Sequence, residues 1–372
     1  MPKPLPSSLE PDPLTQQRRS WADHTLGRLY EATAGLPDRN VLVRPTQRHE
    51  IQSMLAFRGI PVTNRELASI DLPDEGMRQQ LPYNVARYVK VMGEATRDVR
   101  EEPVAEVLKR VARDLAGLSA GSAPEEELPW RTTPRWFGGS PEQAYLSATP
   151  PGADLRAGAE QLFAWMDSPL EMTFVDKVAL GAFQLFTLDP FTNTADLLHV
   201  YVTLELIRSG VLQDQILPVS VHIDRNRAEF HELHQHVVRS SDFNSWVRFF
   251  ADGFAEQCGY QLRVVRELAQ LPERYINKYM RTVKADKRRD GFARLVAILP
   301  RFQVVTSQLI ADRCSFTAKR ARELLLKAEE LEFVEHVEVL RKTKIYEVKD
   351  VCRALDLYTG MTPERDLHVT EK

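Results

Sequence analysis

The sequence predicts a mostly α-helical protein with more than one domain. Its 372 residues exceed what a single hydrophobic core usually serves. Apolar residues recur at helical spacing in several long segments, whereas strand-like patterns are short. The expected helices before the central stretch are residues 21–37, 45–50, 82–92, 104–118, 154–166 and 174–187.

The composition is that of an ordinary soluble protein. The chain is 43% hydrophobic and 27% charged, with a formal net charge of -3. This balance excludes a strong whole-chain attraction to DNA or to an anionic membrane, so any basic surface must be local. Cys258, Cys314 and Cys352 are far apart and predict neither a disulfide framework nor a thiolate zinc site. Residues 1–20 contain no signal-like or membrane-spanning run, so we expect a flexible tail and a cytoplasmic location.

The most informative stretch is residues 188–196, Leu-Asp-Pro-Phe-Thr-Asn-Thr-Ala-Asp, with the helix that follows it. This helix is apolar on nearly every side and stops at Gly210, a pattern typical of a helix in the middle of a domain. We expect Asn193 or Thr194 to be its N-cap. A loop entering such a helix is a natural anion site, because unpaired N–H groups and the helix dipole point at it.

Several other stretches accompany this loop, and together they resemble one family. They include Trp136-Phe-Gly-Gly, Leu217-Pro-Val-Ser, Asp224-Arg-Asn-Arg-Ala-Glu-Phe and Trp246-Val-Arg-Phe-Phe. With residues 189–200 they resemble the core of the Fic family, whose motif is His-Pro-Phe-x-(Asp/Glu)-Gly-Asn-Gly-Arg-x-x-Arg. Most members transfer a nucleoside monophosphate to a protein hydroxyl. The resemblance covers about residues 40–255 and implies a Fic-type helical core with a β-hairpin flap.

The loop keeps Pro190 and Phe191 of that motif and loses most of the rest. The family's His falls at Asp189, its metal-binding acid at Asn193, its glycines at Thr194 and Asp196, its Asn at Ala195, and its arginines at Leu197 and Val200. A Cβ obstructs the close approach of phosphate to the backbone, and aliphatic side chains cannot make arginine's bidentate bonds. Asp196 also places a negative charge where a phosphate would lie. We therefore expect a degenerate motif with no metal or cofactor.

Asp189 has two interpretations. As a catalyst it would replace the family's general base, with a nucleotide or related phosphate donor and Mg²⁺ as cofactors. An aspartate with an ordinary pKa of about 3.9 is a weak base, however, and it would repel a triphosphate. The favoured interpretation is that Asp189 caps a turn before Pro190.

Arg58 is a candidate for closing the pocket. Many relatives carry an inhibitory Ser-x-x-x-Glu-Gly helix end, whose Glu pairs with the second motif arginine. Here the corresponding positions are Arg58 and Val200, so the charge pattern is inverted. We predict that Arg58 pairs with Asp196 or Asp189, and the alternative is an ordinary surface arginine.

Residues 131–137, from Arg131 to Phe137 around a Pro134 turn, resemble the family's flap hairpin. In the family this hairpin holds a target segment by edge pairing, so a protein partner is one expectation and an unpaired hairpin the other. His231, His234 and His236 lie close together on the helix after residue 229, but no acid or cysteine stands at a metal-binding spacing. We expect partly buried helix histidines without a metal.

The charge changes sign after about residue 271. Between Arg274 and Lys327, fourteen Lys or Arg stand against four Asp or Glu, a local balance of +10. Helical patterns at 292–299, 306–313 and 317–328 are followed by strand-like patterns at 333–339 and 345–348. This order is similar to the winged helix-turn-helix module that often ends Fic proteins.

That resemblance implies DNA as a partner. The third helix would enter the major groove and the wing would contact the phosphate backbone. The expected DNA-binding residues are Thr317, Lys319, Arg320, Arg322, Arg341, Lys342 and Lys344. Thr317 is also an expected N-cap, and a winged helix used for dimerisation or protein docking is the alternative.

The expected organisation has six parts: a tail (1–20), an N-terminal helical region (21–100), a Fic-like core (101–260), a basic helical linker (261–290), a winged helix (291–358) and a second tail (359–372). The favoured function is a non-enzymatic regulator of transcription that binds DNA, with no membrane association and with a homodimer as a further possibility. One alternative is a diverged Fic-type transferase that uses Asp189. Another is a protein that titrates an active relative through mixed dimers.

Overall fold

The computed structural model describes residues 3–34, 36, 39–57, 62, 67, 85–116, 127–282, 289–340 and 343–359. These residues fall into two compact units, each described by itself below. The first takes in the described residues within Met1–Arg39, Thr46–Ile70 and Glu75–Gln261. The second takes in Asn40–Pro45 and the described residues after Gln261.

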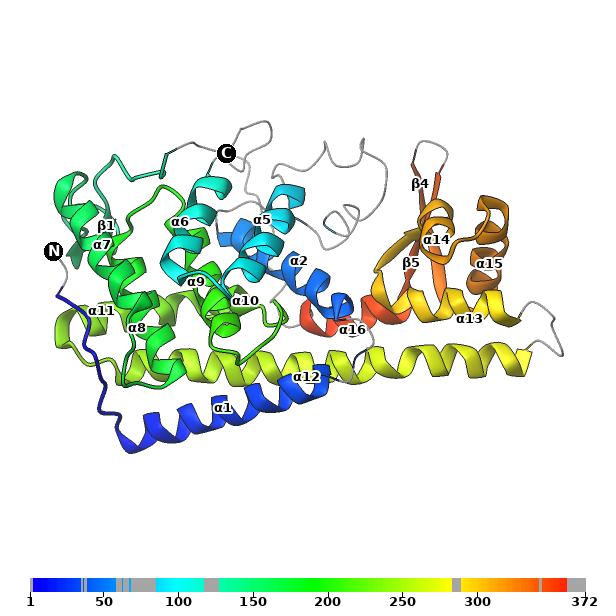
Figure 1. Cartoon of the computed structure of the whole chain (residues 1–372), viewed down its shortest axis with the longest axis horizontal. Helices are drawn as coiled ribbons and strands as arrows, with labels where there is room; N and C mark the ends of the chain where they lie inside the picture. The colour runs from blue at the N-terminus through cyan, green and yellow to red at the C-terminus, as the bar shows by residue number, and fades with distance from the viewer. Residues whose placement is uncertain are drawn as a thin grey trace, which may run out of the picture. The chain divides into compact units, whose positions relative to one another are not determined.

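Helices dominate the chain up to residue 282 (Figure 1). The elements are α1 (Pro13–Ala34), α2 (Asn40–Phe57), α5 (Val85–Asp98), α6 (Val104–Leu115), β1 (Trp136–Phe137), β2 (Leu146–Ser147), α7 (Ala153–Asp167), α8 (Phe174–Leu188), α9 (Thr194–Arg208), α10 (Val219–Arg225), α11 (Arg227–Ser240) and α12 (Asn244–Thr282). The predicted mostly α architecture is therefore confirmed. None of the helices in the described ranges is long and apolar enough to cross a membrane.

The first helix begins earlier than predicted, at Pro13 rather than near Trp21. Asp12 caps it, because its Oδ1 accepts a hydrogen bond from the Thr15 N–H at 2.7 Å. Pro13 suits the first helical position, where no N–H donor is needed. Arg248 pairs with Asp12 at 2.7 Å and ties this end of α1 to α12. The expected tail over residues 1–20 was thus wrong from Pro13 onward.

The centre of the first unit is the pair α8 and α9. Thr173 caps α8 by accepting the Asp176 N–H at 3.3 Å. Both helices are buried along nearly their whole length, as the apolar pattern of α9 predicted. Gly181 lets them approach closely, because the Tyr201 side chain occupies the space that a Cβ would need. The Tyr201 hydroxyl donates to the Lys177 carbonyl at 3.2 Å and fixes this crossing.

The flap is a short antiparallel hairpin, but its strands are joined by residues 138–145, so the expected turn at Pro134 was wrong. Trp136 pairs with Ser147 and Phe137 pairs with Leu146. Phe137 is buried, and its ring centroid lies 5.1 Å from that of Phe186 on α8. The hairpin has strands of only two residues, and an aromatic contact fixes it to the central helix.

The second unit contains the end of α12 and a small mixed fold. Its further elements are α13 (Arg289–Ile298), a 3-10 turn (Leu299–Arg301), β3 (Val304–Thr306), α14 (Ser307–Cys314), α15 (Ala318–Glu330), β4 (Val334–Leu340), β5 (Thr343–Val348) and α16 (Lys349–Thr359). The sheet has the antiparallel order β3-β5-β4. The three expected helices and two expected strands are present, whereas β3 and α16 were not predicted. Tyr275 and Tyr279 of α12 stack on Phe333 and Phe292 at 4.2 and 4.1 Å between ring centroids.

Gly181→Ala should destabilise the first unit, because the new Cβ would overlap the Tyr201 ring at a buried crossing. Overpacking of this kind typically costs about 1–3 kcal/mol, measurable as a lower urea midpoint. Gly93→Ala on α5 is the matched control. Apart from its chain neighbours and its own helix's backbone, no described residue has an atom within 4 Å of the new Cβ position, and alanine favours helix. Equal midpoints for the two variants would contradict the close crossing of α8 and α9.

Candidate functional site

The loop between α8 and α9 starts in a left-handed turn at Asp189. This residue has φ of 46°, a conformation that aspartate tolerates better than most residues. It is the C-cap of α8, and its N–H donates to the Leu185 carbonyl at 3.0 Å. The interpretation of Asp189 as a turn residue before Pro190 agrees with this geometry.

The loop also pairs with the segment that leads into the flap. The Arg131 N–H donates to the Pro190 carbonyl at 2.9 Å, and the Thr192 N–H donates to the Pro129 carbonyl at 2.8 Å. Phe191 is buried beside Trp130, with 5.0 Å between ring centroids. Backbone pairing and aromatic packing together hold Pro190 and Phe191 in place.

Arg131 is the main link between the flap and the loop. Its buried guanidinium donates to the carbonyls of Asp189 at 2.7 Å, Thr133 at 2.7 Å, Thr149 at 2.6 Å and Leu188 at 3.3 Å. Burial lowers the pKa of Arg131, while the charge of Asp189 opposes this effect. An arginine ordinarily stays protonated in a protein, so these are charge-assisted bonds.

The Asp189 carboxylate points toward the flap and is 14% exposed. Its Oδ2 lies 3.3 Å from Arg135 Nε and 3.8 Å from Arg131 Nε. Burial raises the pKa of Asp189, and the two arginines partly offset this effect. Asp189, which the sequence resemblance aligns with the family's general base, is thus paired with Arg135 and Arg131.

The start of α9 differs from the expected cap. Asn193 stands at the N-cap position, but its side chain makes no capping bond. Its Nδ2 instead donates to the Ala112 carbonyl on α6 at 3.0 Å. Thr194 holds the turn from inside the helix, because its Oγ1 accepts the Phe191 N–H at 2.9 Å. The expected side-chain cap by Asn193 or Thr194 was therefore wrong.

The first turns of α9 are buried at the positions that the sequence resemblance aligns with the family's phosphate-binding residues. Asp196 is 2% exposed, and Leu197 and Val200 are fully buried. The Leu197 and Val200 side chains pack into the core. Neither position therefore supplies a cation at the start of the helix. Arg58 lies outside the described residues, so its pairing with Asp196 or Asp189 stays a prediction.

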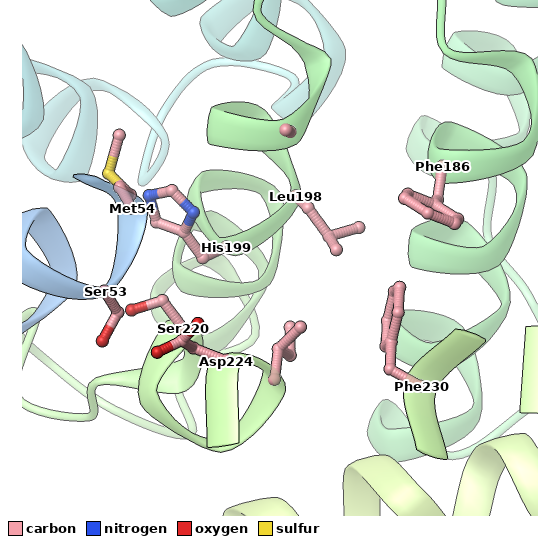
Figure 2. A pocket seen from close by; sticks show the side chains of 10 residues that line it. Ser53, Met54, Phe186, Leu198, His199, Ser220, Asp224 and Phe230 are labelled. Atoms are coloured by element: carbon pink, nitrogen blue, oxygen red, sulfur yellow. The ribbon is translucent and has the colours of Figure 1, made fainter. Parts of the chain in front are cut away.

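A small cavity lies beside the first two turns of α9 (Figure 2). It is lined by Ser53, Met54, Phe186, Ala195, Leu198, His199, Ser220, Ile223, Asp224 and Phe230. Phe186 and Phe230 stand on one side of it, and Met54 and His199 on the other. Its volume is about 40 Å³, which is enough for a few waters at about 10–15 Å³ each. Ligand pockets typically enclose roughly 300–1,000 Å³.

A buried carboxylate supports one wall of this cavity. Glu50 of α2 is fully buried and accepts the Ser220 N–H at the start of α10, at 3.3 and 3.4 Å. Burial raises the pKa of Glu50 to about 7, although these hydrogen bonds oppose the shift. Its neighbour His49 is also buried, and burial lowers the pKa of His49 to about 4. Neither residue was predicted from the sequence, where nothing marks them as buried.

His234 is engaged by hydrogen bonds through both ring nitrogens. Nδ1 lies 2.7 Å from the Tyr145 hydroxyl, and Nε2 lies 2.9 Å from Thr187 Oγ1. Burial lowers the pKa of His234 to about 3, so the ring is neutral near pH 7. In the described part of the chain, no group of three or more His, Cys, Asp or Glu is arranged to hold a metal. His234 instead joins the flap to α8 and α11.

The predicted DNA-binding residues differ in their surroundings. Thr317 caps α15 by accepting the Arg320 N–H at 3.2 Å, as expected. Lys319 and Arg322 are exposed on α15, as is Lys344 on β5. The Arg320 guanidinium lies against Gly291 and pairs with Glu323 at 3.4 Å, so it is engaged within the unit. Arg341 and Lys342 lie outside the described residues.

The comparisons with known proteins bear on the fold. No family model matches the chain, and no curated protein matches it. The structure is similar to the crystal structure of a Fic family protein from Desulfovibrio desulfuricans G20, with a TM-score of 0.54 and 15% sequence identity. The match covers 91% of this chain and 98% of that chain. The chain therefore has a Fic-type fold, as the sequence resemblance implied.

The buried position of Glu50 predicts a specific pH dependence. Suppose a carboxyl has a higher pKa in the folded protein than in the unfolded chain. It then contributes fully to stability at pH values below its pKa in the unfolded chain. This contribution is lost as pH rises through its pKa in the folded protein. Its pKa moves from 4.5 to about 7 on folding, so the contribution lost between these pH values is roughly 3 kcal/mol. His49 acts in the opposite sense between about pH 4 and 6.5.

Glu50→Gln isolates the first effect, because glutamine keeps the shape and cannot ionise. The unfolding free energies of wild type and variant are measured in urea at pH 5 and at pH 8. From pH 5 to pH 8, wild type should lose more unfolding free energy than the variant. A pH-independent difference would show that Glu50 ionises as freely in the folded protein as in the unfolded chain.

Proposed function

We propose that the chain is a Fic-fold regulator that no longer transfers nucleotides and that binds DNA through its C-terminal unit. The observation that carries the proposal is the start of α9. There Asp196 is buried in the first turn, and Leu197 and Val200 occupy the family's arginine positions.

Electrostatics oppose phosphate binding at this helix start. A phosphate would be placed beside the Asp196 carboxylate in a buried setting, where like charges repel strongly. The Cβ atoms of Thr194 and Asp196 further obstruct the close approach of backbone N–H groups that a phosphate site uses. The neighbouring cavity of about 40 Å³ offers no room for a nucleotide.

The C-terminal unit supports the DNA-binding part of the proposal. Its elements follow the order predicted for a winged helix, with α15 as the groove-binding helix and β4 and β5 as the wing. Lys319 and Arg322 are exposed near the N-terminal end of α15, the end that reads bases in such modules. Lys344 on β5 adds a cation at the wing.

A diverged transferase is the second candidate, and one observation favours it. Burial raises the pKa of Asp189, which makes its carboxylate a better base than an exposed aspartate. Arg135 and Arg131 already pair with that carboxylate, however. A transferase would have to release Asp189 from the flap before using it.

Thermal unfolding distinguishes the two candidates. We expect no change in the unfolding midpoint with nucleoside triphosphates, nucleotide-alcohol donors and Mg²⁺, because the anion site carries its own carboxylate. A donor present at a hundred times its dissociation constant would add about 2.7 kcal/mol and raise the midpoint visibly. A rise with any of these donors would replace the first proposal by the transferase.

DNA binding should depend on Lys319 and Arg322. Lys319→Ala and Arg322→Ala should each weaken the binding of a random-sequence DNA duplex. The slope of log K against log salt concentration should become shallower by about one for each phosphate that the variant no longer neutralises. The measurement is fluorescence anisotropy across a salt series. Arg353→Ala is the control, since Arg353 is 74% exposed on α16 of the same unit but belongs to neither α15 nor the wing. An equal loss of affinity in all three variants would point to unspecific charge rather than to α15.

A further inference from the structure

Residues 3–10, here called the strap, run along the surface of α7 and α8 (Figure 1). The Trp165 indole Nε1 of α7 donates to the Pro6 carbonyl at 3.1 Å. The Gln184 amide Nε2 of α8 donates to the Lys3 carbonyl at 3.2 Å. Two side chains of the helical core thus recognise the backbone of an extended segment.

The spacing of the two carbonyls has a physical meaning. Pro4 and Pro6 fix their own φ near -65°, and a residue before proline is restricted to extended conformations, so Lys3 and Leu5 are restricted as well. A chain of this kind favours the polyproline II helix, which has three residues per turn. Carbonyls three residues apart, as in Lys3 and Pro6, then point to the same side. An aromatic surface with such donors is the usual way to bind a polyproline II segment.

The strap leaves empty space between itself and the helical core. A cavity of about 550 Å³ lies between the strap and the core. The core contributes mostly apolar side chains to it, among them Phe183 of α8, Val237 of α11 and Phe243. Within the described part of the chain, the bonds to Trp165 and Gln184 are the only hydrogen bonds that residues 3–10 make. The strap is therefore held by few contacts over a groove with unused space.

We propose that this groove is a docking site for an extended, proline-containing segment of a partner protein, and that the strap occupies it in the isolated chain. The occupant is argued from the strap itself, whose Lys-Pro-Leu-Pro sequence shows which chemistry the groove accepts. A partner segment with two prolines at alternate positions would satisfy the same donors and place larger apolar side chains in the cavity. This inference concerns a different surface from the α9 site and is independent of DNA binding.

The test uses the full chain and a fluorescent peptide with the sequence of residues 1–12. Binding is measured by anisotropy to wild type and to a strap variant, Pro4→Gly with Pro6→Gly. The strap competes with the peptide at an effective concentration on the order of millimolar. Weakening the strap should therefore tighten peptide binding roughly tenfold, whereas a peptide with both prolines changed to alanine should bind poorly to either protein.

Trp165→Phe, made in the strap variant, tests the donor directly, because phenylalanine keeps an aromatic ring and removes the indole N–H. We expect threefold to tenfold weaker peptide binding, consistent with the loss of one hydrogen bond. Trp21→Phe on the exposed face of α1 is the matched control and should bind as before. Circular dichroism checks that each variant is folded.

Three results would overturn the proposal. One is equal affinity of the peptide for wild type and for the strap variant. Another is equal binding of the proline and alanine peptides. The third is binding of a small apolar dye by the strap variant without any binding of the peptide, which would make the groove a small-molecule site.

Discussion

The arrangement of the first unit depends on the Arg131 guanidinium. Four backbone carbonyls converge on it, from the base of the flap, from Thr149 and from the end of α8. The bonds to the Thr149 and Leu188 carbonyls are buried, and a buried acceptor without a partner costs about 1–3 kcal/mol. The Arg131 side chain thus donates to four backbone carbonyls from three parts of the chain. It also fixes the flap against the loop that leads into α9.

This constraint explains which parts of the family motif remain. Pro190 and Phe191 belong to the framework, because the Pro190 carbonyl pairs with the Arg131 N–H and Phe191 packs on Trp130. In the sequence resemblance, the positions that differ from the motif are those that contact a phosphate or a metal in the family. The loop can therefore keep its shape without a ligand, since its framework contacts are made within the protein.

The sequence predicted α7, α8 and α9 because burial imposes a period on their apolar residues, but it did not show that α12 is one helix from Asn244 to Thr282. It missed the start of α1, where the signal was the single pair Asp12-Pro13, and it missed β3, which is too short to show alternation. The role of Arg131 was beyond sequence reasoning, because its partners lie up to 58 residues away in the chain. The side-chain cap by Asn193 failed for a related reason: its Nδ2 donates to the distant Ala112 carbonyl, and its side chain makes no bond to the helix N–H groups.

The changes at α9 also have a favourable side for stability. Glycine in a helix costs about 1 kcal/mol relative to alanine, so Thr194 and Asp196 each favour the helix more than the family's glycines would. The helix dipole also favours a carboxylate in the first turn. A phosphate site keeps its backbone open and its charge unpaired until the ligand arrives. The start of α9 is instead closed, because Asp196, Leu197 and Val200 are all buried there.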